Sequence, residues 1–262
     1  MKKKLPKIIV TAIILNFSFS AFAQVQKDDK RVEEKSVSEN GQPNLIKFNE
    51  LSSYKSSESQ KVFKEQLGLK DSQSFTKIKT ESDKQGYTHE KFQLYEQGIK
   101  VEFANYTLHS KDGKLVSMNG EFYNIENVKL APSLSAQDAF NRAVGYTRAT
   151  EYLWDKPQDA RELGYEKPKG ELVLLPDMEQ QGQKRGSDKV RLAYKFDIYA
   201  TKPLSRGDLY IDAETGKALF YNATIKHLND NVHGSKVSNS AKNETGSKKA
   251  FVAPTAATRY RG

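Results

Sequence analysis

His89 and Glu90 begin a pattern that would carry metal chemistry if it were complete. In the zinc-binding helix motif HExxH, two histidines one helical turn apart bind the metal and the glutamate acts as a base. The position of the second histidine holds Gln93 in this chain. Apolar and polar residues also alternate here, with Phe92 and Leu94 two positions apart, which is the period of a strand. We therefore predict that His89 is not a zinc ligand.

No other arrangement of reactive residue types predicts catalysis. The chain has no cysteine and four histidines, the other three being His109, His227 and His233. No two histidines are spaced i, i+4, and neither a GxSxG nucleophile motif nor a phosphate-binding glycine loop is present. We predict no catalytic residue and no structured metal site. An occasional metal contact at His227 and His233 is the alternative left open.

Residues 1–23 have the three parts of a secretory signal peptide. Lysines at positions 2, 3, 4 and 7 precede an apolar run over residues 8–22, which ends in small residues. We predict cleavage between Ala23 and Gln24, and a secreted or periplasmic location. A retained membrane anchor is the weaker alternative, because polar residues interrupt the run and it is shorter than the roughly 20 residues of a spanning helix.

The composition disfavours several other classes of protein. The formal charge of +9 falls by four, to +5, without the signal-peptide lysines, and the remaining charges form no basic block. The basic and aromatic strand pattern of an RNA-recognition motif is also missing, so nucleic-acid binding is disfavoured. An exported chain without cysteine has no disulfides, so apolar burial must stabilise it. We expect a monomer that does not associate with membranes after signal removal.

Two successive sets of elements predict an α+β fold of two small domains, each a helix packed on an antiparallel sheet. In the first domain, residues 45–130, Ser57 caps a helix that ends at Gly68. In the second, residues 131–226, Ser135 caps a helix. Glycine-containing turns separate the strands, which are expected at residues 75–82, 87–95, from 99, from 114, 171–175, 190–201, 207–211 and 217–225.

The remaining segments are predicted to lack regular structure. Residues 24–44 are polar and charged, so we expect them to be disordered, and residues 227–255 have the composition of a flexible linker. Residues 146–170 are expected to form a loop-rich insertion. The aromatic residues of the strands are predicted to form sheet core, and they are Phe92, Tyr106, Tyr194, Phe196, Tyr210, Phe220 and Tyr221.

The first domain resembles the fungalysin/thermolysin propeptide domain. The resemblance rests on residues 89–95 and 114–120 and on the residues between them that match the motif. Lys91 and Lys100 depart from the Arg and Pro that are usual there. Residues 193–199 and 209–217 resemble the PepSY domain that accompanies this propeptide domain. The motif residues, for which we expect structural roles, are His89, Phe92, Gln93, Tyr95, Gly98, Val101 and Gly120.

This resemblance implies the pro-region of a secreted thermolysin-like zinc metalloendopeptidase of the M4 family. Such a pro-region acts as an intramolecular chaperone and inhibitor of its cognate catalytic domain and is then removed. Residues 256–262 resemble the opening strand of that catalytic domain, with Arg261 in place of the usual Ser. Zinc and calcium are expected only in the catalytic domain, and these residues alone are not expected to be an enzyme. A stand-alone exported PepSY-type protease inhibitor or binding module is the alternative.

The resemblance also nominates bonds for processing. Thermolysin-like enzymes resemble one another in cleaving before a large apolar residue. The predicted linker offers four such bonds, and we favour the first three because they lie just beyond the last predicted strand. The four bonds are His227-Leu228, Asn231-Val232, Lys236-Val237 and Ala250-Phe251.

Overall fold

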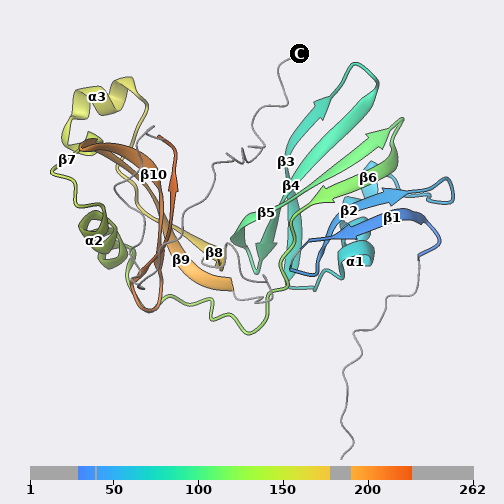
Figure 1. Cartoon of the computed structure of the whole chain (residues 1–262), viewed down its shortest axis with the longest axis horizontal. Coiled ribbons are helices and arrows are strands. Elements are labelled where there is room, and N and C mark those ends of the chain that lie inside the picture. Colours follow the sequence, from blue (N-terminus) through green and yellow to red (C-terminus); the bar gives the residue numbers. More distant parts are fainter. Residues whose placement is uncertain (1–28, 39, 178–189, 226–262) are drawn as a thin grey trace, which may run out of the picture. The chain divides into compact units, whose positions relative to one another are not determined.

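A computed structural model of the chain describes residues 29–38, 40–177 and 190–225 (Figure 1). Strands account for 48% of the structure and helices for 18%, so the class is α+β with the sheet dominant. Several predictions lie outside the described residues. These are the signal peptide and its cleavage between Ala23 and Gln24, the linker with its processing bonds, and residues 256–262.

The first part of the chain contains the predicted helix and four predicted strands, preceded by two further strands. Helix α1 ends at Gly68, which has a φ of +68°, as predicted. Its N-cap is Glu58, without a side-chain capping bond, because a 3-10 turn over Ser56–Glu58 replaces the predicted cap at Ser57. The elements are β1 (Val32–Val37), β2 (Pro43–Phe48), α1 (Ser59–Leu67), β3 (Gln73–Ser82), β4 (Tyr87–Glu96), β5 (Ile99–Lys111) and β6 (Lys114–Gly120).

The second part contains the predicted helix α2 and four long strands. The cap is confirmed, because the amide of Asp138 donates to Ser135 Oγ at 3.1 Å. The loop-rich insertion is more ordered than predicted, since it contains a short strand, a 3-10 turn over Leu153–Asp155 and the short helix α3, which begins at a proline. The elements are α2 (Ala136–Thr147), β7 (Glu151–Tyr152), α3 (Pro157–Glu162), β8 (Glu171–Pro176), β9 (Val190–Lys202), β10 (Leu204–Asp212) and β11 (Ala218–Ala223).

Strand β1 corrects the prediction that residues 24–44 are disordered. The strand pairs with β2 in an antiparallel ladder from Val32 opposite Phe48 to Val37 opposite Pro43. The prediction failed because β1 lies at the edge of the sheet and is mostly exposed, so its sequence lacks an apolar period. Its partner strand supplies the burial instead, with Ile46 fully buried.

The sheet is continuous, which corrects the prediction of two separate antiparallel sheets. Among the described residues, one sheet runs in the order β1-β2-β6-β5-β8-β9-β10-β11, with β3 and β4 attached to β5 and β7 attached to β9. The link is a short parallel pairing of β5 with β8, in which Lys100 lies opposite Val173 and Val101 opposite Leu174. Residues 121–135, which include the predicted domain boundary, contain no helix or strand.

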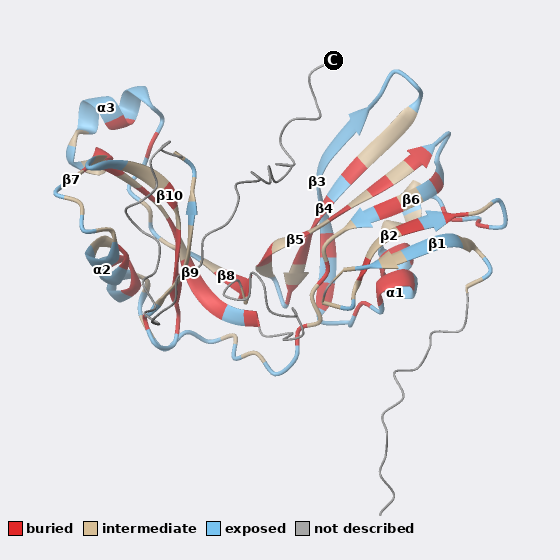
Figure 2. Ribbon diagram, in the orientation of Figure 1, coloured by how far each residue is buried: buried red, intermediate tan, exposed pale blue. Residues whose placement is uncertain are grey.

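The two longer helices cover the buried face of this sheet. In α1, Phe63 is fully buried against Phe75 and Phe92, with ring centroids 4.2 and 5.1 Å away. In α2, Phe140 packs against Phe196 at 5.6 Å. Buried red segments alternate with tan, partly buried ones along β5 in Figure 2. In β8, β9 and β10 both faces are buried in places, because Val173, Leu175, Ala193 and Tyr210 form a second apolar cluster.

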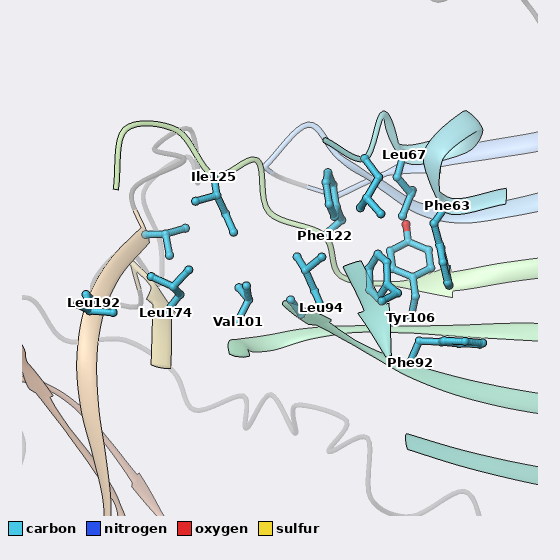
Figure 3. Packing of buried hydrophobic residues seen from close by; sticks show 14 of the residues in the cluster. Phe63, Leu67, Phe92, Leu94, Val101, Tyr106, Phe122, Ile125, Leu174 and Leu192 are labelled. Carbon is cyan, nitrogen blue, oxygen red and sulfur yellow. The ribbon is translucent and has the colours of Figure 1, made fainter. Parts of the chain in front are cut away.

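Apolar residues connect the two parts of the core. Val101 and Leu174 are fully buried on either side of the β5–β8 pairing, and they belong to the same cluster as Leu94 and Leu192 (Figure 3). This continuity explains why the described residues up to Ile225 group into one compact unit.

We predict that Gly120→Ala destabilises the chain by at least about 1–3 kcal/mol, the usual cost of overpacking. A Cβ at this position would overlap the carbonyl oxygen of Asn105 and lie 2.7 Å from Tyr106 Cα, and neither backbone can move without breaking the β5–β6 pairing. The free energy of unfolding in urea measures the effect.

The matched control is Gly145→Ala, inside α2, where an added Cβ meets nothing within 4 Å. This change should stabilise the chain by about 0.5–1 kcal/mol, because glycine is the poorer helix former. Equal effects of the two substitutions would contradict the close approach at Gly120.

Candidate functional site

The motif residues predicted from the sequence gather around one irregular place in the β4–β5–β6 part of the sheet. Gln97 and Gly98 form the turn between β4 and β5, with φ angles of +46° and +81°, as a two-residue hairpin turn requires. Along the ladder that follows, Tyr95 lies opposite Lys100 but Gln93 lies opposite Asn105. Two steps along β4 therefore correspond to five along β5, so residues between 100 and 105 form a bulge.

Gln93 holds this bulge in place. Its buried side-chain amide donates to the carbonyl oxygens of Val101 at 2.6 Å, Ala104 at 3.1 Å and Leu94 at 3.1 Å. Within the bulge, Phe103 has a φ of +61°, a conformation that is costly for a bulky residue. The two hydrogens of this amide are shared among three carbonyl oxygens, of which those of Val101 and Ala104 belong to the bulge.

The bulge allows β5 to change partners along one edge. Before it, Lys100 and Val101 pair with β8, and after it the ladder with β6 begins where Tyr106 lies opposite Gly120. The other edge of β5 stays with β4 on both sides of the bulge. Gly120 fits here because it lacks the Cβ that would overlap the backbone of Asn105.

The other motif residues have similar roles. Phe92 is buried against Phe63, and Val101 is fully buried beside Leu174. Tyr95 is half-buried, opposite Lys100. The structure therefore places Phe92 and Val101 in the core and Tyr95 in the β4–β5 ladder.

A buried ionic cluster lies just beside the bulge, and sequence reasoning did not find it. The Glu102 carboxylate, whose side chain is 7% exposed, binds Lys100 Nζ at 2.7 Å and accepts from the Tyr210 hydroxyl at 3.1 Å. Lys195 lies 3.7 Å from Glu102 and 3.3 Å from Asp208. Burial and the Glu102 charge raise the pKa of Tyr210 well above its ordinary value. The cluster joins β5 to β9 and β10, so it reinforces the two-residue pairing of β5 with β8.

His89 contacts a second histidine, His109, which the sequence analysis did not connect with it. The two residues lie opposite each other on β4 and β5, and their Nδ1 atoms are 2.6 Å apart. His89 Nε2 lies 3.4 Å from Asp83 Oδ2, and His109 Nε2 lies 2.5 Å from Asn119 Oδ1. Counting outward from the β4–β5 turn in regular register places His89 opposite Tyr106, and the three extra residues of the bulge bring His109 opposite it instead.

The electrostatics of the pair favour a neutral His109. Burial lowers the pKa of His109, the bond to Asn119 opposes this effect, and the charge of His89 lowers the pKa further. In Asp83, a backbone hydrogen bond from Tyr87 lowers the pKa, and bonds from Gln85 and His89 act in the same direction.

The described residues do not fit the zinc that the HExxH-like start suggests. They contain no group of three or more His, Cys, Asp or Glu side chains arranged to hold a metal ion. Protein zinc sites use three or four such ligands, whereas the histidine pair offers two imidazoles already bonded to each other.

Residues 73–122 match the Fungalysin/Thermolysin Propeptide Motif. The match begins at the first residue of β3 and ends at Phe122, just after β6, and so includes the whole bulge. The motif indicates a propeptide of fungalysin- or thermolysin-type proteases.

The other comparisons add little. Among solved structures, the chain is similar to the Bacillus megaterium YpeB C-terminal domain, with 11% sequence identity, a TM-score of 0.32, and coverage of 70% of this chain and 72% of that chain. A search of curated proteins finds no match. Within the part of the chain that the structure describes, no helix has the length and apolar character needed to cross a membrane.

We predict that Gln93→Leu lowers the free energy of unfolding by about 1–3 kcal/mol. Leucine preserves most of the buried volume but removes the amide that donates to Val101, Ala104 and Leu94. Urea denaturation followed by circular dichroism measures the loss.

Gln137→Leu is the matched control, because this glutamine is exposed on α2 and its amide donates to the exposed Asn141 side chain. Its effect should stay within about 0.5 kcal/mol. Similar small losses in both variants would show that the Gln93 amide does not stabilise the bulge.

Proposed function

We propose that the chain contains the pro-region of a secreted thermolysin-like zinc metalloendopeptidase, and that this region assists folding of the catalytic domain, inhibits it and is then removed. The observation that carries the proposal is the match of residues 73–122 to the propeptide motif. The signal-peptide pattern of residues 1–23 supports export of the precursor.

The roles of the motif side chains support a function that depends on shape. The Gln93 side-chain amide hydrogen-bonds to three backbone carbonyl groups, and the Phe92 ring packs against Phe63. Gly120 allows the backbone of β6 to approach that of β5 closely. These residues define how β4, β5 and β6 are arranged, and the side chains of Gln93 and Phe92 are buried and do not face a substrate. A motif of this kind suits a protein that presents a fixed surface to one partner, which we infer to be the cognate catalytic domain.

Covalent attachment to the catalytic domain would strengthen the action of the proposed pro-region. A pro-region in the same chain as its catalytic domain acts at an effective concentration in the millimolar range for a short flexible linker. Modest affinity is then enough to keep the catalytic cleft closed. The same affinity, if it is greater for the folded catalytic domain than for the unfolded one, also stabilises the folded domain.

The second part of the chain, residues 131–226, completes the proposed pro-region as a PepSY domain, on the basis of residues 193–199 and 209–217. We infer that the exported precursor is monomeric. Zinc and calcium would belong to the catalytic domain.

We predict that the purified chain inhibits a thermolysin-like zinc endopeptidase and increases the yield of active enzyme on refolding from denaturant. Steady-state hydrolysis of a peptide substrate and the recovered activity measure the two effects. A serine protease of unrelated fold is the control and should keep its full activity. Unchanged activity and unchanged refolding yield of several thermolysin-like enzymes would argue against a pro-region.

We also predict that processing of the precursor exposes a large apolar residue in the linker. The expected new N-termini are Leu228, Val232 and Val237, since cleavage is expected after His227, Asn231 and Lys236. N-terminal sequencing of the mature enzyme tests this expectation. A mature enzyme that begins at none of these residues would rule out the favoured bonds while leaving the inhibition result intact.

A further inference from the structure

The histidine pair belongs to a continuous chain of polar contacts across three strands and a turn. The order is Asp83, His89, His109 and Asn119, with separations of 3.4, 2.6 and 2.5 Å. Because side chains alternate along β4, His89 lies on the face opposite Phe92, which packs against α1. The pair is therefore on the uncovered face of the sheet and partly accessible, with 27% of the His89 side chain exposed.

The contacts specify how many protons the pair holds. Asn119 Oδ1 only accepts hydrogen bonds, so His109 Nε2 carries a hydrogen. A neutral His109 then has a lone pair on Nδ1, which accepts from the Nδ1–H of His89. The remaining nitrogen of His89 faces the Asp83 carboxylate and carries a hydrogen only when His89 is positively charged. One charged and one neutral ring satisfy every contact.

Other charged groups on this face modulate the pair without bonding to it. Glu81 of β3 lies opposite His89 in the ladder and is paired with Lys79 at 2.6 Å. The Tyr87 ring stacks 6.5 Å from His89 and lies under Lys111 Nζ. The remaining charged groups on this face are Lys91 of β4, and Lys47 of β2 with its partner Glu34 of β1.

We propose that His89 and His109 form a proton-sensitive latch that is closed with one shared positive charge and is opened by a second proton. A second proton must bind His109 Nδ1, where it removes the acceptor of the His89 hydrogen bond and places two positive rings in contact. Their repulsion separates β4 from β5 on this face and frees Asn119 of β6. The latch opens as the pH falls to a value below about 6.5, the ordinary histidine pKa, because the second proton binds His109.

Asp83 connects the latch to the turn between β3 and β4. Its Oδ1 accepts from the amides of Gln85 at 2.8 Å and Tyr87 at 2.9 Å, and its Oδ2 faces His89. Movement of His89 therefore alters this turn as well as the β4–β5 pairing. The latch involves only residues of this chain. Evidence against the latch would therefore not contradict the proposed pro-region function.

The test is a pH titration of the full chain with ¹⁵N-labelled histidine, followed through the ring nitrogens by NMR. His227→Gln and His233→Gln assign the other two histidines. We expect His109 to titrate below the ordinary histidine value, because burial and the His89 charge lower its pKa. We also expect His109 in the tautomer protonated at Nε2. Titration of His109 at the ordinary histidine value, or its protonation at Nδ1 in the neutral ring, would overturn the latch.

The substitution His89→Asn removes the neighbouring charge and should raise the pKa of His109. Lys47→Gln removes a charge from the same face without contact with the pair, so it should shift His109 less. An unchanged His109 titration in His89→Asn would contradict the coupling. The wild-type titration remains decisive if a variant does not fold.

A stability measurement completes the test. Because the pKa of His109 is lowered in the folded state, the unfolded chain takes up its proton first as the pH falls. The contribution of His109 to stability is therefore present above about pH 6.5 and is lost below it. The urea midpoint of the wild type should fall more between pH 7.5 and pH 5 than that of His109→Gln, and equal falls would overturn the proposal.

Discussion

The structure depends on the ability of β5 to serve two different partners along one edge. The edge takes β8 at Lys100 and Val101, and it takes β6 from Tyr106 onward. A regular strand would continue with one neighbour, so the change requires extra backbone between the two pairings. The bulge supplies this backbone at the cost of a positive φ at Phe103, and the Gln93 amide donates to the carbonyl groups of Val101 and Ala104 within it.

The motif residues share a connection with this change of partner in β5. Gly98 closes the hairpin, Gln93 fills the bulge, Val101 buries the junction with β8 and Gly120 lets the end of β6 approach β5. Each of them shapes the same strand. A propeptide motif that encodes one backbone irregularity implies that the arrangement of β5 matters for binding the proposed partner more than any single exposed side chain does.

Local signals in the sequence predicted most elements but not their long-range connections. The cap at Ser135, the end of α1 at Gly68 and the glycine turns are properties of a few adjacent residues, and the structure contains all of them. The edge strand β1 and the pairing of Lys100 with Val173 depend on partners distant in the sequence. No local period reports such pairings, which is why one continuous sheet was predicted as two.

Only part of the candidate site could be predicted, because several of its contacts are also between residues distant in the sequence. Residue types identified Gln93 and His89 as unusual, but the role of Gln93 depends on carbonyls in the next strand, and the partner of His89 lies 20 positions away. Glu102 was missed because its contacts come from Lys195 and Tyr210, far along the chain. Knowledge of the register would have recovered these contacts, and the bulge is what made the register hard to read.

The buried ionic cluster at Glu102 has a consequence for how the molecule comes apart. Loss of β9 or β10 would remove the contact of the Glu102 carboxylate with Lys195 or Tyr210 and weaken the connection between the two parts. Unfolding of one part therefore destabilises the other. We expect the two parts to unfold in a single cooperative step. Such cooperativity means that a single proteolytic cut which disrupts β9 or β10 would expose the rest of the described segment to rapid digestion.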